Sequence, residues 1–257
     1  MLTVISQPDA RDWTSLPYDD VDYRVDLDRD IRGWRIAYCP NLCSARPDAE
    51  VARIAREAVR AFETLGAIVE DVPSPIASPR ASFELLWAAS MAQVYRKVPV
   101  EARERLDPGF ASFARAGLDI TASQLLDAIG LRHADGAAMN AFHDNYDLLI
   151  TPQMPTTAFV AGVDFPRDRD MTSWLDWSPY TYPFNWTQQP AASLPCGLAS
   201  DGLPVALQIV GARYAEDKVL RASRAFERIR PRLGMPAGMV AHAGGDDPAK
   251  VGSRMRD

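Results

Sequence analysis

Apolar residues recur in short runs and at helical spacing along most of the chain. Residues 34–38 form a short apolar run that predicts a buried strand, and Pro47 opens a helix that ends at Gly66. Apolar positions in that helix recur at steps of three and four, which places one stripe against a sheet. Residues 67–72 then alternate as a strand. This order predicts a parallel pair of strands with a right-handed helical crossover, and therefore an α/β fold.

The same patterns predict further elements. Helical periods cover residues 81–97 and 121–145, and a strand is expected at residues 146–150, stopped by Pro152. Residues 205–210 alternate as a strand after the turn at Asp201 and Gly202, with residues 192–196 as its hairpin partner. A last helix is expected at about residues 216–230.

Three segments lack a sustained period. Residues 1–30 are rich in Asp, Pro and Tyr and are expected to form an extended amino-terminal arm. Residues 152–177 are expected to form a long loop that covers a pocket, because loops of this length in compact domains are more often functional than idle. Residues 233–257 are expected to be a disordered tail, since they carry few apolar side chains. The folded domain is then residues 31–232.

The net charge of the chain is −6, from 28 Lys and Arg against 34 Asp and Glu. This balance repels a phosphate backbone, so nucleic acid is not expected as a partner. No apolar run reaches eighteen residues, and residues 1–12 show no secretory leader. We therefore expect no membrane association and a cytoplasmic location.

Cysteine and histidine give little sign of catalytic or metal chemistry. Cys39 and Cys43 lack the second ligand pair of a structural zinc site, and an odd total of three matches no disulfide framework. Cys196 could act as a thiolate nucleophile, but a buried thiol at the end of a strand is the favoured interpretation. Structural roles are favoured for the three histidines, and no metal site is expected. The histidines are His133, His143 and His242.

Six large aromatic rings crowd residues 174–186. Pro179 and Pro183 interrupt any regular period there, so the rings could line a concave pocket or could simply belong to the core. The sequence leaves both interpretations open. The rings belong to Trp174, Trp177, Tyr180, Tyr182, Phe184 and Trp186.

Four segments resemble the amidase signature hydrolases. Residues 183–197 read Pro-Phe-Asn-Trp-Thr-Gln-Gln-Pro-Ala-Ala-Ser-Leu-Pro-Cys-Gly, and residues 203–211 read Leu-Pro-Val-Ala-Leu-Gln-Ile-Val-Gly. Residues 146–152, Tyr-Asp-Leu-Leu-Ile-Thr-Pro, and residues 30–38, Asp-Ile-Arg-Gly-Trp-Arg-Ile-Ala-Tyr, are similar to two further family segments. All four follow the family's order, and the resemblance covers about residues 1–230. Gln188 and Ala206 depart from it, since each stands where the family usually has glycine.

The resemblance implies a fold and a reaction. The fold is a mixed central sheet flanked by helices, corresponding to the carboxyl-terminal half of the amidase signature fold. The reaction is hydrolysis of a carboxamide through an acyl-enzyme intermediate, with a Ser, a second Ser in a cis peptide and a Lys, and without metal or organic cofactor. The three lysines, Lys97, Lys218 and Lys250, lie near no Ser cluster, and the 257 residues contain no Gly/Ser-rich loop. We therefore expect no catalytic residue here and no activity of this chain alone.

The resemblance also suggests substrate-binding residues. Four are expected to form a pocket wall, and two are expected to place polar groups near the acyl end of the substrate. It is equally consistent with the sequence that the four belong to the core and that the two polar side chains are hydrogen-bonded within a loop. The wall residues are Trp177, Tyr180, Phe184 and Asn185, and the polar residues are Thr187 and Gln189.

The expected partners are a small-molecule amide and a separate amino-terminal half that completes the site. The alternative is a non-catalytic binding module or a subunit that completes a site with a separate amino-terminal half. A third interpretation is a truncated gene remnant or a misplaced start codon. The substrate itself is not readable from the sequence, because the loop at residues 152–177 would set its shape.

Overall fold

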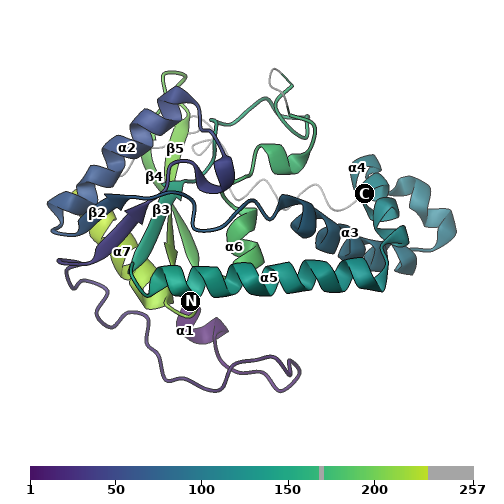
Figure 1. The fold of residues 1–257 in the computed structure, drawn as a ribbon, viewed down its shortest axis with the longest axis horizontal. Coiled ribbons are helices and arrows are strands. Elements are labelled where there is room, and N and C mark those ends of the chain that lie inside the picture. Colours follow the sequence, from purple (N-terminus) through teal and green to yellow (C-terminus); the bar gives the residue numbers. More distant parts are fainter. Residues whose placement is uncertain (168–170, 231–257) are drawn as a thin grey trace, which may run out of the picture.

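The computed structural model describes residues 1–167 and 171–230, and it contains a five-stranded sheet in the order β2-β1-β3-β5-β4 (Figure 1). The strands are β1 (Arg35–Tyr38), β2 (Ile68–Asp71), β3 (Leu148–Pro152), β4 (Ala191–Leu198) and β5 (Pro204–Gly211). Strand β1 is parallel to β2 and β3, whereas β5 is antiparallel to β3 and β4. The sheet is therefore mixed, and the predicted α/β class, crossover unit and hairpin are confirmed.

One face of the sheet is covered by α2 (Ala49–Thr64) and α7 (Glu216–Ile229). The two helices meet where Phe62 and Phe226 stack, with ring centroids 5.3 Å apart. Helix α2 approaches β4 closely, because a Cβ on Gly197 would lie 2.6 Å from the Ile54 methyl group. Only glycine fits at this point of the Pro-Cys-Gly segment.

The other face is covered by α5 (Ala122–His143), α6 (Tyr182–Thr187) and a short 3₁₀ helix at Leu42–Ser44. Helix α5 begins with a capping box in which Thr121 and Gln124 each satisfy the other's backbone N–H. Met139 of α5 packs on Leu149 of β3 and Ala37 of β1. Because both faces are covered, every residue of β3 is buried.

A helical layer extends sideways from the sheet (Figure 1). It consists of α3 (Arg80–Lys97), α4 (Pro108–Ala116) and 3₁₀ helices at Val100–Arg105 and Gly117–Asp119. Its small core contains Tyr95, Ala111 and Ala114. The predicted helix at residues 81–97 is α3, whereas α4 was not predicted.

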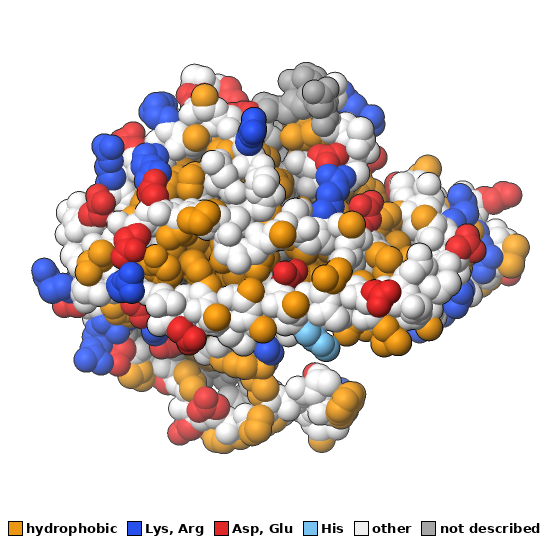
Figure 2. Space-filling view, viewed as in Figure 1, with side chains coloured by type: hydrophobic (Ala, Val, Ile, Leu, Met, Phe, Trp, Pro, Cys, Tyr) orange, Lys and Arg blue, Asp and Glu red, His pale blue; other side chains and the backbone are white. Residues whose placement is uncertain are grey.

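The first thirty residues lie along the outside of the molecule (Figure 1). They contain one short helix, α1 (Leu2–Ile5), and Asp28 forms ion pairs with Arg224 and Arg228 of α7. Apolar side chains are exposed on this arm, as Figure 2 shows in the lower part of the view, and Trp13 is 93% exposed. The predicted domain boundaries stay a prediction, and the expected tail at residues 233–257 lies outside the described residues.

Among the helices of residues 1–167 and 171–230, none is long and apolar enough to cross a membrane.

The contact between Gly117 and α3 provides a test of this packing. A Cβ on Gly117 would collide with the Ala88 backbone carbonyl, so Gly117→Ala is expected to destabilise the fold by about 2 kcal/mol. At Gly130 of α5 no described atom lies within 4 Å of an added Cβ. Gly130→Ala is therefore the matched control and should stabilise by about 0.5–1 kcal/mol. Urea unfolding measures the free energy of unfolding of both variants. Equal changes in that free energy would contradict the close contact between Gly117 and α3.

Candidate functional site

The aromatic segment lies between the sheet and the helical layer and is fixed at several points. Tyr180 is fully buried, and its hydroxyl donates to the Pro40 carbonyl at 2.7 Å. The Tyr180 carbonyl accepts from Gln208 Nε2 of β5, also at 2.7 Å. The Tyr182 hydroxyl lies 3.4 Å from Ser78 Oγ, just before α3. This segment therefore connects the residues after β1 and the middle of β5 to the start of α3.

Helix α6 is attached to α5 by two polar contacts. Trp186 Nε1 donates to the Asp135 carboxylate at 2.8 Å, and Arg132 Nε donates to the Trp186 carbonyl at 2.7 Å. Pro183 is in the first turn of α6, where no backbone N–H is required. Thr187 Oγ1 donates to the Pro183 carbonyl at 2.9 Å, which closes the helix from inside.

The backbone at Gln188 is left-handed, with a φ of 66°. Its N–H donates to the Phe184 carbonyl at 2.7 Å and so terminates α6. A left-handed residue at a helix end is usually glycine, because a Cβ is disfavoured there. Ala206, the other position where the family pattern has glycine, is in β5 and pairs with Pro195, beside the bulge of β4 between Pro195 and Gly197.

The six predicted site residues do not share one environment. Tyr180 and Phe184 are core residues on the α5 side of the sheet, whereas Asn185 is exposed. Thr187 and Gln189 are buried and in contact through the Thr187 hydroxyl and Gln189 Oε1, and Gln189 Nε2 has no partner among the described residues. Their role in substrate binding stays a prediction.

The loop at residues 152–177 lines two cavities. A cavity of about 240 Å³ lies beside β5, with Met154, Phe159, Trp177 and Val205 in its walls. Trp177 packs edge-on against Phe159, with centroids 5.3 Å apart, and donates from Nε1 to the Asp164 carbonyl at 3.1 Å. A larger cavity of about 360 Å³ lies between the loop and helices α3 and α4. The loop therefore separates two spaces.

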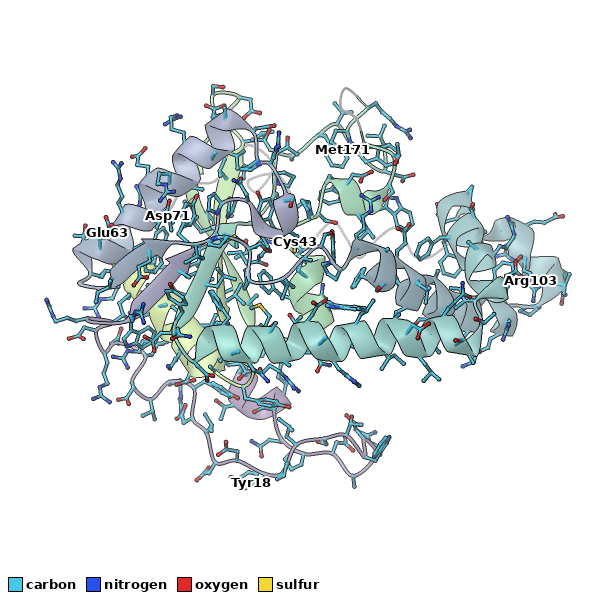
Figure 3. The ribbon with its side chains drawn as sticks, viewed as in Figure 1. Tyr18, Cys43, Glu63, Asp71, Arg103 and Met171 are labelled. Carbon is cyan, nitrogen blue, oxygen red and sulfur yellow. The ribbon has the colours of Figure 1, made fainter. Side chains whose placement is uncertain are left out.

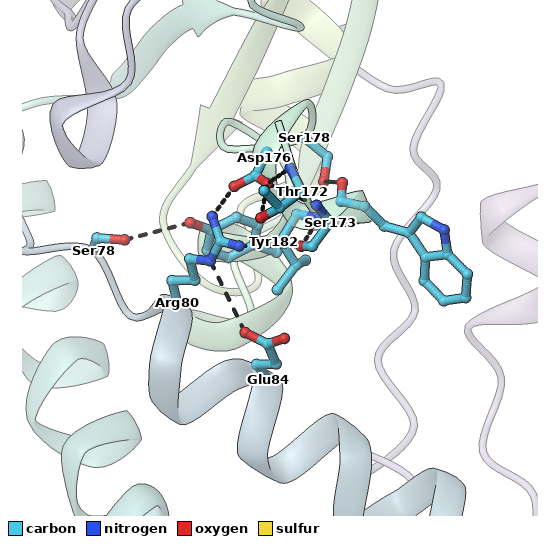
Figure 4. A network of polar contacts seen from close by, with 10 residues as sticks. Ser78, Arg80, Glu84, Thr172, Ser173, Asp176, Ser178 and Tyr182 are labelled. Carbon is cyan, nitrogen blue, oxygen red and sulfur yellow. Dashed lines mark hydrogen bonds and ion pairs between the residues drawn. The ribbon is translucent and has the colours of Figure 1, made fainter. Parts of the chain in front are cut away.

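An ion pair holds the end of this loop against α3 (Figure 4). The Arg80 guanidinium contacts the Asp176 carboxylate and donates to Ser173 Oγ at 3.1 Å. The second Asp176 oxygen accepts from the backbone N–H groups of Thr172 and Ser173, at 2.7 and 2.8 Å. Burial raises the pKa of Asp176, but these bonds outweigh it, so the pKa lies below its ordinary value of 3.8. Asp176 is therefore ionised at neutral pH.

The buried thiols are not activated. Burial raises the pKa of Cys196 to about 12 and those of Cys39 and Cys43 to about 11, so all three are protonated at neutral pH. All three are free thiols, and Cys43 lies near the middle of the molecule (Figure 3). Burial of Cys196 agrees with the favoured interpretation of a thiol at a strand end.

The histidines and lysines add no obvious catalytic group. Burial lowers the pKa of His143, and its Nδ1 lies 3.1 Å from the Tyr146 carbonyl. His133 is exposed, and Lys218 pairs with Asp147 at 2.7 Å. His242 and Lys250 lie outside the described residues. Among those described, no three His, Cys, Asp or Glu side chains gather as a metal site would require.

The sequence profile of the Amidase family matches residues 1–220. The chain belongs to the amidase family. The four motif segments are thus family segments, and in this amidase fold they form β1, β3, α6 with β4, and β5.

Curated relatives support the same assignment. An acylamidase of Rhodococcus erythropolis is 29% identical over 243 residues, covering 90% of this chain and 50% of its own length. The A subunit of the glutamyl-tRNA(Gln) amidotransferase of Myxococcus xanthus is 32% identical over 257 residues, covering 89% of this chain and 51% of its own length. The chain therefore spans about half the length of these relatives.

Solved structures show the same correspondence. A bacterial aryl acylamidase of the amidase signature family superposes with a TM-score of 0.75 at 28% identity, covering 88% of this chain and 49% of that chain. The A subunit of the Thermotoga maritima glutamyl-tRNA(Gln) amidotransferase superposes with a TM-score of 0.69 at 26% identity. The superposition covers 90% of this chain and 51% of that subunit.

Sequence reasoning missed the residues that position the loop. Arg80 and Asp176 are 96 positions apart, and each looks like an ordinary surface charge in its own segment. The ring cluster of Trp87, Phe113 and Trp174 was missed because α4 was not predicted. Of these three rings, the sequence marked only Trp174 as a possible pocket residue, because it belongs to the aromatic run at residues 174–186.

Restoring the family glycines provides a paired test. Gln188→Gly is expected to stabilise the protein by about 0.5–1 kcal/mol, because it removes the Cβ from a left-handed residue. Ala206→Gly is expected to destabilise by a similar amount, because glycine in a strand has more conformational freedom to lose on folding than alanine. Thermal and urea unfolding would measure both variants. Destabilisation by Gln188→Gly would show that the left-handed backbone is not strained by its side chain.

Proposed function

We propose that this chain acts as the carboxyl-terminal half of an amidase that hydrolyses a carboxamide through an acyl-enzyme intermediate. Membership of the amidase family and the match to about half the length of the relatives carry this proposal. Residues 1–257 contain no Gly/Ser-rich loop with a nearby Lys, so the nucleophile comes from a complementary amino-terminal half. That half is either part of the same longer protein or a separate chain.

The proposed contribution of this chain is the wall of the substrate pocket. Trp177 lines the cavity beside β5, which supports its assignment to the wall. Gln189 Nε2 is a buried donor without a partner among the described residues, and buried donors are normally satisfied. In the proposal it donates to the acyl end of the substrate, and the Gln189 amide lies against the Thr187 hydroxyl. Tyr180 and Phe184 lie in the core on the α5 side of the sheet and Asn185 is exposed, so none of the three lines this cavity and their part in the wall stays a prediction.

The free edge of the sheet supports a complementary half. In the described part of the chain, β4 pairs only with β5, and its eight residues include no charged side chain. An open edge pairs with other chains unless charges, proline or a bulge protect it, and β4 carries only Pro195 and the bulge that follows it. The amidotransferase relative is itself named as one subunit. Strand pairing with the amino-terminal half would satisfy this edge.

The test compares the chain alone with the chain together with the amino-terminal half encoded upstream of Met1. The 257 residues alone should show no anilide hydrolysis above the buffer rate and no labelling by a fluorophosphonate serine probe. Co-expression with a Lys- and Ser-bearing half should give both signals, and Gln189→Leu should then lower kcat/KM by about 10-fold, as loss of a buried hydrogen bond does.

Two outcomes would decide against this proposal. Serine-dependent turnover by the chain alone would show that it carries its own nucleophile. A stable complex without turnover or labelling would show instead a non-catalytic subunit, which is the alternative function.

A further inference from the structure

Among the described residues, four aromatic side chains line the larger cavity. Trp87 of α3 lies 4.9 Å from Phe113 of α4 and 5.9 Å from Trp174, between ring centroids, and Phe113 and Trp174 are 6.4 Å apart. Phe165 lines the same space. A volume of about 360 Å³ is in the range of small-molecule sites. The cavity can therefore hold a ligand about as large as one substituted ring.

Within residues 1–167 and 171–230, the charged residues that line the cavity are both acidic, and one cation, Arg167, lies against the Phe165 ring of the wall. The acidic residues are Glu84 on α3 and Asp164 in the loop. Arg80, the nearest cation on α3, is directed to Asp176 and Ser173, and its Nε lies 4.0 Å from Glu84, as Figure 4 shows. Glu84 is thus only loosely compensated, and the cavity favours positive charge.

Aromatic faces strengthen that preference. The face of an indole or phenyl ring attracts a cation through its quadrupole, and the attraction grows as water is excluded. Phe165 already carries such a contact, with the Arg167 guanidinium 4.4 Å from its ring centroid. Trp87, Phe113 and Trp174 leave further ring surface in the wall.

We propose that this cavity binds an organic ammonium ion with an aromatic body, its ring packed among Trp87, Phe113 and Trp174 and its charge near Glu84. Trp177 does not line this cavity, although its Nε1 donates to the carbonyl of Asp164 in the cavity wall, and the proposal goes beyond the proposed amide hydrolysis. The cavity is lined by residues of the described part of this chain, so binding can be tested on this chain.

The test titrates the full chain at pH 7 with three probes of one shape: 2-phenylethylamine, 2-phenylethanol and phenylacetate. Calorimetry and tryptophan fluorescence follow binding, since Trp87 and Trp174 lie in the wall. The amine should bind about 3–10-fold more tightly than the alcohol, and the carboxylate should bind most weakly. Equal affinity for amine and carboxylate, or no binding of the amine at millimolar concentration, would overturn the proposal.

Variants then locate the site. Ser112 is exposed on α4 and lines the cavity, so Ser112→Leu should fill it and weaken amine binding at least 10-fold without disturbing the core. Ser123→Leu, at an exposed position of α5, is the matched control and should leave binding unchanged. Glu84→Gln should bring amine and alcohol affinities within about two-fold of each other while alcohol binding persists. Circular dichroism checks the fold of each variant, and unchanged amine binding in Ser112→Leu would overturn the proposal.

Discussion

The ion pair between Arg80 and Asp176 fixes the position of the candidate site. It joins the first turn of α3 to the end of the loop at residues 152–177, and so holds the helical layer beside the aromatic segment. The Asp176 side chain is 15% exposed, so its desolvation is costly. Four hydrogen-bond donors, two of them backbone N–H groups, offset that cost. Both cavities border the segment that this pair holds.

The sheet provides the rigid base for that arrangement. Strand β3 is buried on both faces, between α2 and α7 on one side and α5 and α6 on the other, and β5 connects it to β4. One side of the molecule is therefore a closed core, whereas the uncharged edge of β4 and the apolar arm stay open. This asymmetry fits a chain that spans half the length of its relatives. The open surfaces are where the proposed second half would pack.

Strong periodicity explains which elements the sequence predicts. Helix α2 and strand β5 match their patterns to within two residues at either end, because α2 buries one regular stripe and β5 is a short apolar run buried on both faces of the sheet. Helix α4 was missed because it is short and its fully buried positions, Ala111 and Ala114, are small residues that give a weak apolar stripe. Helix α6 was missed because Pro183 reads as a breaker, although it is in the first turn. The family's glycine at position 188 indicated an unusual backbone there, which the left-handed φ of Gln188 shows. No local pattern predicts a contact between residues as far apart in the sequence as Arg80 and Asp176.

A double-mutant cycle on Arg80 and Asp176 tests most directly whether this pair holds the site. With Arg80→Gln, Asp176→Asn and the double variant, urea unfolding at pH 7 should give a coupling free energy of about 1–3 kcal/mol. Because the pKa of Asp176 is depressed in the folded state, the coupling should be complete above its ordinary value of 3.8 and disappear as the pH falls through the folded pKa. Additive effects at pH 7, with coupling below about 0.3 kcal/mol, would contradict a positioning role for the pair.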